Sequence, residues 1–179
     1  MTVHVTRRKT GAVIDLFRFP NPVNEKAART VAAGVVVLAV ATLAFRTPWL
    51  LGLLAYGFVA RVATGPTLSP LGQLATRVIA PRLGPPKFVP GPPKRFAQGI
   101  GAFCSVSAFV AYLLGAATLS WILVAMITVF ATAESAAGFC VGCVIFGRLQ
   151  ARGIIPASVC EACDNVRSRA AGPSVPAVS

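Results

Sequence analysis

Four long apolar runs separated by short polar segments dominate the pattern of this chain. The runs cover Val31 to Phe45, Pro48 to Ala63, Phe96 to Thr118 and Leu119 to Gly147, with almost no charge inside them. A helix needs about 20 residues to cross the hydrocarbon core of a bilayer. The pattern therefore predicts an all-α, polytopic integral membrane protein with four transmembrane helices.

Capping and turn signals arrange these runs as two helical hairpins. Asn24 followed by Glu25 is typical of a helix start, because an Asn side chain caps free amides and an early Glu suits the helix dipole. Arg46-Thr47-Pro48 predicts a tight turn after the first helix. We expect an N-terminal segment at 1–23, a membrane domain at 24–147, a cytoplasmic tail helix at 148–170 and a disordered tail at 171–179.

The loop between the hairpins, at about 65–95, carries a further helix signal. Ser69-Pro70 supplies a cap and a first helical residue. Apolar residues then recur with a period near 3.6 at Leu71, Leu74, Ala75, Val78 and Ile79. The pattern predicts a short amphipathic helix in the cytoplasmic interface, which Pro81 ends, and then an extended basic strap from Gly84 to Lys94.

Composition and charge agree with a membrane protein. The 179 residues are 55% hydrophobic and only 12% charged, which is too apolar for one soluble domain. The net charge of +12 does not indicate nucleic acid, because the 17 basic residues lie between the apolar runs and not on a face interleaved with aromatics. Sixteen of them lie on one side of the bilayer if both termini and the central loop are cytoplasmic, with Arg46 alone on the other.

Two CxxC pairs are the candidates for chemistry. Cys140 and Cys143 are separated from Cys160 and Cys163 by 16 residues, which is within the range for four-cysteine zinc sites. Four thiolates satisfy a tetrahedral zinc ion, and a reducing cytoplasm favours metal or redox use over permanent disulfides. A tail helix over Pro156 to Arg169, folded back under the fourth span, would bring the two pairs together.

A redox dithiol is the competing interpretation of the first pair, and inert packing is the third. Cysteines become nucleophilic at a helix N-terminus or beside cations. Because the fourth run is predicted to be helical as far as Gly147, Cys140 should lie near a C-terminal helix end, where the dipole opposes a thiolate. A break and restart at Gly138 would reverse that argument.

Glu134 is the only acidic residue inside a predicted span. Carboxylates inside a membrane are costly and usually face a partner within the bundle. Glu134 lies 14 residues beyond Ser120, and Arg61 lies 12 residues beyond Trp49. These separations put both at similar depths, about 21 and 18 Å, on a rise of roughly 1.5 Å per residue. We predict a structural Arg61–Glu134 ion pair, with a proton or ion relay as the alternative.

Several motifs of this chain occur together. They are Asn21-Pro22-Val23-Asn24, Gly65-Pro66, Ser69-Pro70-Leu71-Gly72, Gly91-Pro92-Pro93-Lys94-Arg95-Phe96-Ala97 and Gly138-Phe139-Cys140-Val141-Gly142-Cys143. As a set they resemble the bacterial family called domain of unknown function 4395, over about Asn21 to Cys163. The resemblance implies a small multi-pass protein of the bacterial plasma membrane without an assigned activity. Some members are encoded near thioredoxin-like and sulfurtransferase proteins, which implies thiol or sulfur chemistry with a partner of that kind.

The sequence thus predicts a membrane protein, embedded in the lipid bilayer, with a cytoplasmic four-cysteine site for zinc or for thiol redox and sulfur handling. The alternative is a small transporter or an assembly subunit of a membrane complex that uses Glu134, with purely structural cysteines. No motif identifies a substrate or a reaction, which favours a protein that is not an enzyme.

Overall fold

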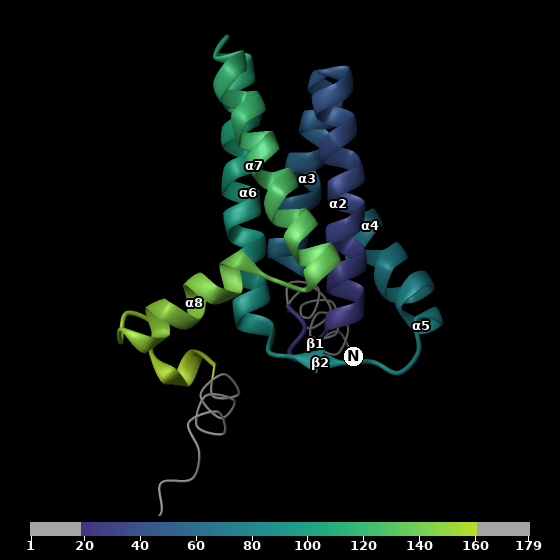
Figure 1. Ribbon diagram of the computed structural model, residues 1–179, viewed down its shortest axis with the longest axis vertical. Coiled ribbons are helices and arrows are strands. Elements are labelled where there is room, and N and C mark those ends of the chain that lie inside the picture. Colours follow the sequence, from purple (N-terminus) through teal and green to yellow (C-terminus); the bar gives the residue numbers. More distant parts are fainter. Residues whose placement is uncertain (1–18, 161–179) are drawn as a thin grey trace, which may run out of the picture.

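The computed structural model describes residues 19–160, and most of them are helical (Figure 1). Four helices stand side by side as a bundle: α2 (Glu25–Phe45), α3 (Pro48–Thr64), α6 (Gly91–Leu113) and α7 (Ala117–Ala137). Three of them, α2, α6 and α7, are long and apolar enough to cross a membrane, whereas α3 is a shorter apolar helix of 17 residues. The all-α prediction is confirmed. Of the four predicted transmembrane helices, three have the length and composition to span a membrane.

The two predicted hairpins are present. Asn24 caps α2, since its Oδ1 accepts a hydrogen bond from the backbone N–H of Lys26 at 3.1 Å. Arg46 ends α2 in the left-handed conformation, with φ of 50°, and Pro48 starts α3. The segment 114–116 connects α6 to α7 at the same end of the bundle. We call the opposite end, where α2 and α6 begin, the basal end.

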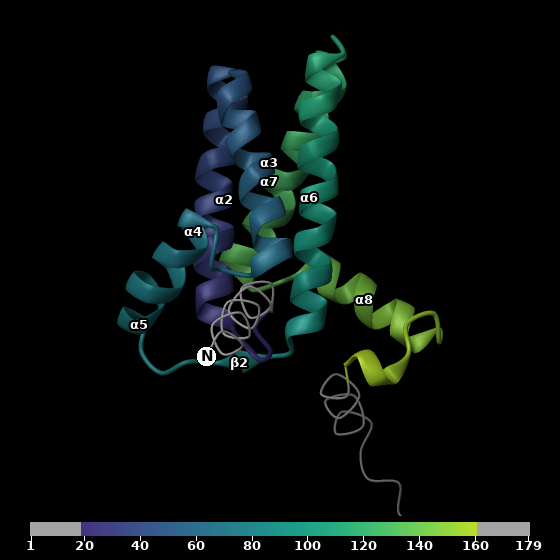
Figure 2. The same ribbon diagram turned by 180° about the vertical axis from the view of Figure 1, so that it is seen from behind.

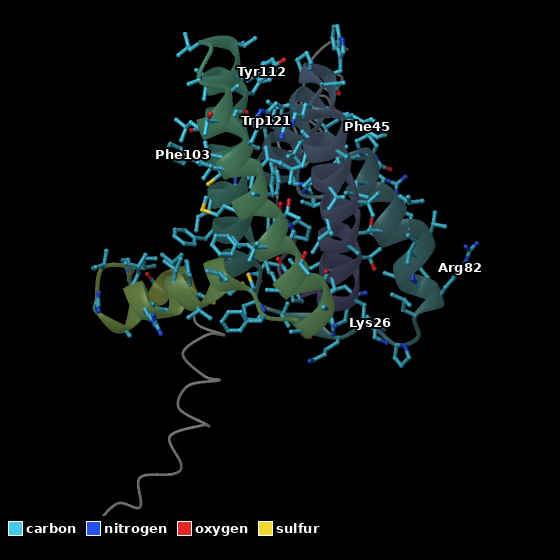
Figure 3. All side chains as sticks on the ribbon, turned by 45° about the horizontal axis from the view of Figure 1, so that its top comes forward. Lys26, Phe45, Arg82, Phe103, Tyr112 and Trp121 are labelled. Atoms are coloured by element: carbon cyan, nitrogen blue, oxygen red, sulfur yellow. The ribbon has the colours of Figure 1, made fainter. Side chains whose placement is uncertain are left out.

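The surface of the bundle is largely apolar. In the most apolar 18-residue window of each of the helices α2, α6 and α7, only 17 to 28% of the window is buried inside the structure. Phe45, Phe103 and Val129 are 64 to 75% exposed, and Phe103 projects away from the bundle (Figure 3). A compact cluster that includes Leu51 and Val124 forms the core between the helices. Exposed apolar surface of this extent suits lipid and not water.

The helix α6 begins inside the segment that was predicted as an extended strap. Pro92 and Pro93 occupy its first turn, where a missing N–H leaves no hydrogen bond unmade. The extended part therefore shrinks to 84–90, and β2 (Phe88–Val89) within it pairs antiparallel with β1 (Val23–Asn24). As a consequence, Lys94 lies on a helix at the base of the bundle.

The predicted helix of the central loop is present and longer than expected. It runs through α4 (Pro70–Gln73), the π-helix η1 (Leu74–Ile79) and α5 (Ala80–Arg82). It leaves the bundle on the side opposite α8 (Val141–Ala151) (Figure 2). The Ser69 hydroxyl caps it by accepting a hydrogen bond from the N–H of Gly72. Pro81 does not end this helix, because the wider π turn before it accommodates the proline.

Candidate dithiol site at the start of α8

The fourth apolar run forms two helices instead of one. Gly138 follows α7 in the left-handed conformation, with φ of 68°, and α8 (Val141–Ala151) begins three residues later. Glycine adopts this conformation without the strain that a Cβ would cause. The guanidinium of Arg29 secures the break by donating hydrogen bonds to the carbonyls of Ser135 and Ala136, at 2.7 to 3.2 Å. The prediction of one continuous helix is therefore wrong.

The restart places Cys140 at the N-terminus of α8 and not near a C-terminal helix end. Its Sγ accepts a hydrogen bond from the backbone N–H of Cys143 at 3.3 Å. Cys140 is buried, Cys143 is half-buried, and both are free thiols. Amides at a helix N-terminus stabilise negative charge. The dipole argument against a thiolate at Cys140 therefore reverses.

The two thiols of this pair are electrostatically different. The pKa of Cys140 is lowered, mainly because the Cys143 thiol donates a hydrogen bond to the Cys140 sulfur; Lys94 and the backbone N–H act in the same direction, against burial and Glu134. The pKa of Cys143 is raised, because its deprotonation would remove that hydrogen bond and leave a second charge in a buried site. Cys140 is thus the thiol of the pair that ionises more readily.

An ion pair on α6 and α7 neighbours the thiols. Lys94 Nζ lies 2.6 Å from Glu134 Oε1, and the two side chains are 12% and 16% exposed. The predicted Arg61–Glu134 pair is not formed: Arg61 donates hydrogen bonds to Gln98 Oε1 at 3.0 Å and to Ser69 Oγ at 3.3 Å. Because α6 begins earlier than predicted, Lys94 projects into the bundle and forms the ion pair with the Glu134 carboxylate.

Close packing of α8 on α6 fixes the position of the dithiol. A Cβ added at Gly142, the second residue between the two cysteines, would lie 2.5 Å from the Cβ of Ala97. The rings of Phe96 and Phe146 meet edge to face beside this contact, with centroids 5.7 Å apart. The glycine within the CxxC motif is therefore required for the two helices to approach.

Cys140 and Cys143 line an open groove of about 440 Å³ between α8 and the start of α6. Lys94, Phe139 and Phe146 contribute to its walls. Cys140 also borders a smaller and more enclosed cavity of about 140 Å³ inside the bundle. The groove is the wider route by which a sulfur atom of another molecule can approach the thiols.

The second cysteine pair does not complete a metal site in the described part of the chain. Cys160 is buried and disulfide-bonded, so it would have to be reduced before it could act as a zinc ligand. Cys163 lies outside the described residues, as does most of the predicted tail helix, of which the structure describes a short 3-10 turn at Ala157–Val159. Among residues 19–160, no three His, Cys, Asp or Glu side chains gather as a metal ion would require. The four-cysteine zinc site therefore stays a prediction.

Comparison with known proteins gave one match. Neither the curated proteins nor the solved structures matched this chain significantly. The model of one protein family matches residues 23–151, a range that contains the bundle, the loop helix, Cys140 and Cys143, and that ends before the second cysteine pair. The family suggested by the sequence motifs is thereby confirmed. The chain belongs to the family described as Domain of unknown function (DUF4395).

Proposed function

We propose that this protein is a membrane-anchored thiol–disulfide exchange protein, in which Cys140 is the nucleophile and Cys143 the second thiol. The observation that carries the proposal is the position of Cys140 Sγ at the N-terminus of α8, where it accepts the N–H of Cys143. Reactive dithiols of the CxxC type depend on this electrostatic setting. Residues three apart on a helix are also neighbours, so the two sulfurs can form a disulfide.

The exchange proceeds in two steps that balance in atoms and electrons. The Cys140 thiolate attacks one sulfur of a disulfide in a partner; a Cys140–partner bond forms, the partner's S–S bond breaks, and the released thiolate takes a proton from water. Cys143 then loses its proton and attacks Cys140 Sγ, which releases the partner's second sulfur as a thiol. The partner's disulfide is reduced to two thiols by two electrons. Cys140 and Cys143 lose these two electrons when they form their own disulfide.

The membrane arrangement that belongs to this proposal has four spans and cytoplasmic termini. It includes α3 as the fourth span, because α3 packs against α2 and α6 within the bundle. It is supported by the distribution of the basic residues, 16 of which then lie on the cytoplasmic side. The dithiol groove at the basal end would open at the cytoplasmic face of the plasma membrane.

The partner that we infer is a thioredoxin-like or sulfurtransferase protein in the cytoplasm. Phe139 and Val144 are 53% and 36% exposed at the groove, which offers apolar contact to a loop that carries a cysteine.

A trapping experiment tests the function. In Cys143→Ser the second step cannot occur, so a mixed disulfide between Cys140 and the partner should accumulate in membranes and appear on non-reducing gels. Cys140→Ser should trap nothing, and Cys104→Ser, which changes a buried cysteine of α6, should behave as wild type. Absence of any Cys140-dependent adduct would contradict the proposal.

Elemental analysis of the same purified protein tests the zinc alternative. About one zinc per chain, lost in both Cys140→Ser and Cys160→Ser, would favour a structural metal site built from all four cysteines. A metal-free protein that still forms the mixed disulfide would favour the exchange reaction.

A further inference from the structure

Arg61, in the last turn of α3, is a buried cation without a counter-charge among the described residues. Its side chain is 5% exposed. Nε and Nη1 donate hydrogen bonds to Gln98 and Ser69, and the guanidinium carbon lies 4.6 Å from the ring centroid of Phe58. Nη2 is buried and has no hydrogen-bond partner. All three neighbours are neutral, so none of them cancels the charge.

The acidic side chains of the described residues are already paired. The chain has five acidic residues. Glu25 lies 2.8 Å from Lys87, and Glu134 lies 2.6 Å from Lys94. The other three acidic residues are outside the described range. A buried guanidinium without a counter-charge is strongly unfavourable, so binding of an anion at Arg61 would stabilise the protein.

Arg61 borders a cavity of about 130 Å³ at the basal end of the bundle. The walls come from the segment before α2, from the central loop and from the first turns of α6, where Lys94 and Gln98 contribute. Gln98 uses its amide oxygen for Arg61, so its NH₂ group remains as a donor. Lys94 is paired with Glu134 and the lining is otherwise largely apolar, so the charge of Arg61 and the NH₂ group of Gln98 form the polar side of this cavity.

We propose that this cavity binds a small oxyanion, a phosphate group, at the guanidinium of Arg61. A guanidinium presents N–H groups in a planar fork that matches phosphate oxygens, and such charge-assisted hydrogen bonds are strong. At the basal end of a membrane-spanning bundle, the phosphate group belongs either to inorganic phosphate or to the headgroup of an anionic lipid.

The first test measures thermal unfolding of the full-length protein in an uncharged detergent, while sodium chloride is replaced by sodium phosphate at constant ionic strength. The melting temperature of the wild type should rise by several degrees and saturate, because the ligand binds the native state. The response should disappear in Arg61→Gln. It should persist in Arg77→Gln, which removes the same charge from an exposed position of η1.

Equilibrium dialysis with labelled phosphate gives a second readout that does not depend on Arg61→Gln being foldable. Arg61→Lys keeps the charge but lacks the guanidinium fork, and it should weaken phosphate binding at least tenfold.

Lipid bicelles separate the two sources of the phosphate group. Saturable stabilisation by inorganic phosphate identifies a soluble oxyanion, whereas a response to phosphatidic acid in phosphatidylcholine bicelles, without a response to free phosphate, identifies a lipid headgroup. Either result supports the site if it depends on Arg61. No response to phosphate or phosphatidic acid, or an equal response in Arg61→Gln, would overturn the proposal.

Discussion

Lys94 Nζ lies 2.6 Å from Glu134 Oε1, and this ion pair joins the first turn of α6 to the last turns of α7. Both side chains are nearly enclosed, at 12% and 16% exposure, so neither charge can turn to water when the other is removed. The pair also acts on the dithiol, because the Lys94 charge favours a thiolate at Cys140 and the Glu134 charge opposes it. The same two residues therefore connect the stability of the bundle with the reactivity of the site.

A double-mutant cycle tests this ion pair. Lys94→Met and Glu134→Gln should each destabilise the protein, and their combination should be less harmful than the sum, with a coupling of roughly 0.5–3 kcal/mol in detergent unfolding. The control cycle combines Arg61→Met with Glu134→Gln and should be additive within about 0.5 kcal/mol. Coupling in the control cycle alone would show that Glu134 pairs with Arg61, as the sequence predicts, and not with Lys94.

The reactivity of Cys140 should persist to lower pH than that of an ordinary thiol. Its lowered pKa means that the thiolate is present above that value and is lost only as the pH falls through it. Cys143→Ala removes the largest cause of the lowering, so the midpoint of Cys140 alkylation by iodoacetamide should move upward, toward the ordinary pKa of about 9.0. Mass spectrometry of protein alkylated at a series of pH values measures the midpoint.

The matched control for this measurement is Cys143→Ser, whose hydroxyl can still donate a hydrogen bond to the Cys140 sulfur. It should raise the midpoint less than Cys143→Ala does. Equal midpoints in the wild type and both variants would show that the Cys143 thiol does not stabilise the Cys140 thiolate.

Helix starts could be predicted from the sequence because the signals are local. Asn24 and Ser69 cap helices with their own side chains, and Pro48 pre-forms a first turn, so each needs only its immediate neighbours. The break at Gly138 is different. A single glycine is tolerated inside a helical pattern, and the apolar run continues past it. The contact that secures the break comes from Arg29, 106 residues away from Ser135 in the chain.

The candidate site was likewise predictable from local signals but not from contacts between distant residues. The spacing of Cys140 and Cys143 is visible in the sequence, but the electrostatic setting of the two thiols depends on the break before them. Lys94 was missed as the partner of Glu134 because Pro92-Pro93 suits an extended strap as well as a first helical turn. Only the pairing of Phe88–Val89 with β1, which fixes where the strap ends, separates these two readings.

Replacement of the glycine at the break tests whether it creates the site. Gly138→Ala should destabilise the protein by about 1–2 kcal/mol, because a residue with a Cβ is strained at φ of 68°. Space is not the cause, since the nearest atom to the added Cβ would be 3.5 Å away. The variant should favour continuation of α7 and slow the alkylation of Cys140. Thermal unfolding and alkylation rates measure the two effects.

Gly147→Ala is the control for this substitution. Gly147 lies within α8, and a Cβ there would meet no atom within 4 Å, so the exchange should leave stability unchanged or improve it. If both variants left the alkylation rate of Cys140 at the wild-type value, the left-handed break would not be the source of its reactivity.

Gly142→Ala tests the packing of α8 on α6. The added Cβ would lie 2.6 Å from the Cα of Ala97, so relief requires the two backbones to separate. Overpacking of this kind should cost about 1–3 kcal/mol and should expose Cys143 to bulky maleimides. The measurement is the rate of labelling by a polyethylene-glycol maleimide in a background in which Cys143 is the one remaining cysteine and Cys104, Cys140, Cys160 and Cys163 are replaced by Ser. An unchanged rate and melting temperature would show that α8 does not dock on α6.

The number of spans can be decided by reporter fusions, because the arrangements with and without α3 as a span differ at every fusion site except the one after Arg46. With four spans, a reporter active outside the cytoplasm should give a signal after Arg46 and after Gly115, and none after Lys87 or at the C-terminus. If α3, at 17 residues, fails to cross, the segment from α3 to α6 and the C-terminal tail lie outside and Gly115 inside. That arrangement would carry ten more basic residues across the membrane, six between Arg61 and Arg95 and four after α7, against the preference for cytoplasmic cations. A signal after Lys87 together with silence after Gly115 would establish it. Glu25 and Lys94, which border the same groove, would then lie on opposite sides of the membrane, so this result would contradict both the four-helix bundle and the dithiol groove.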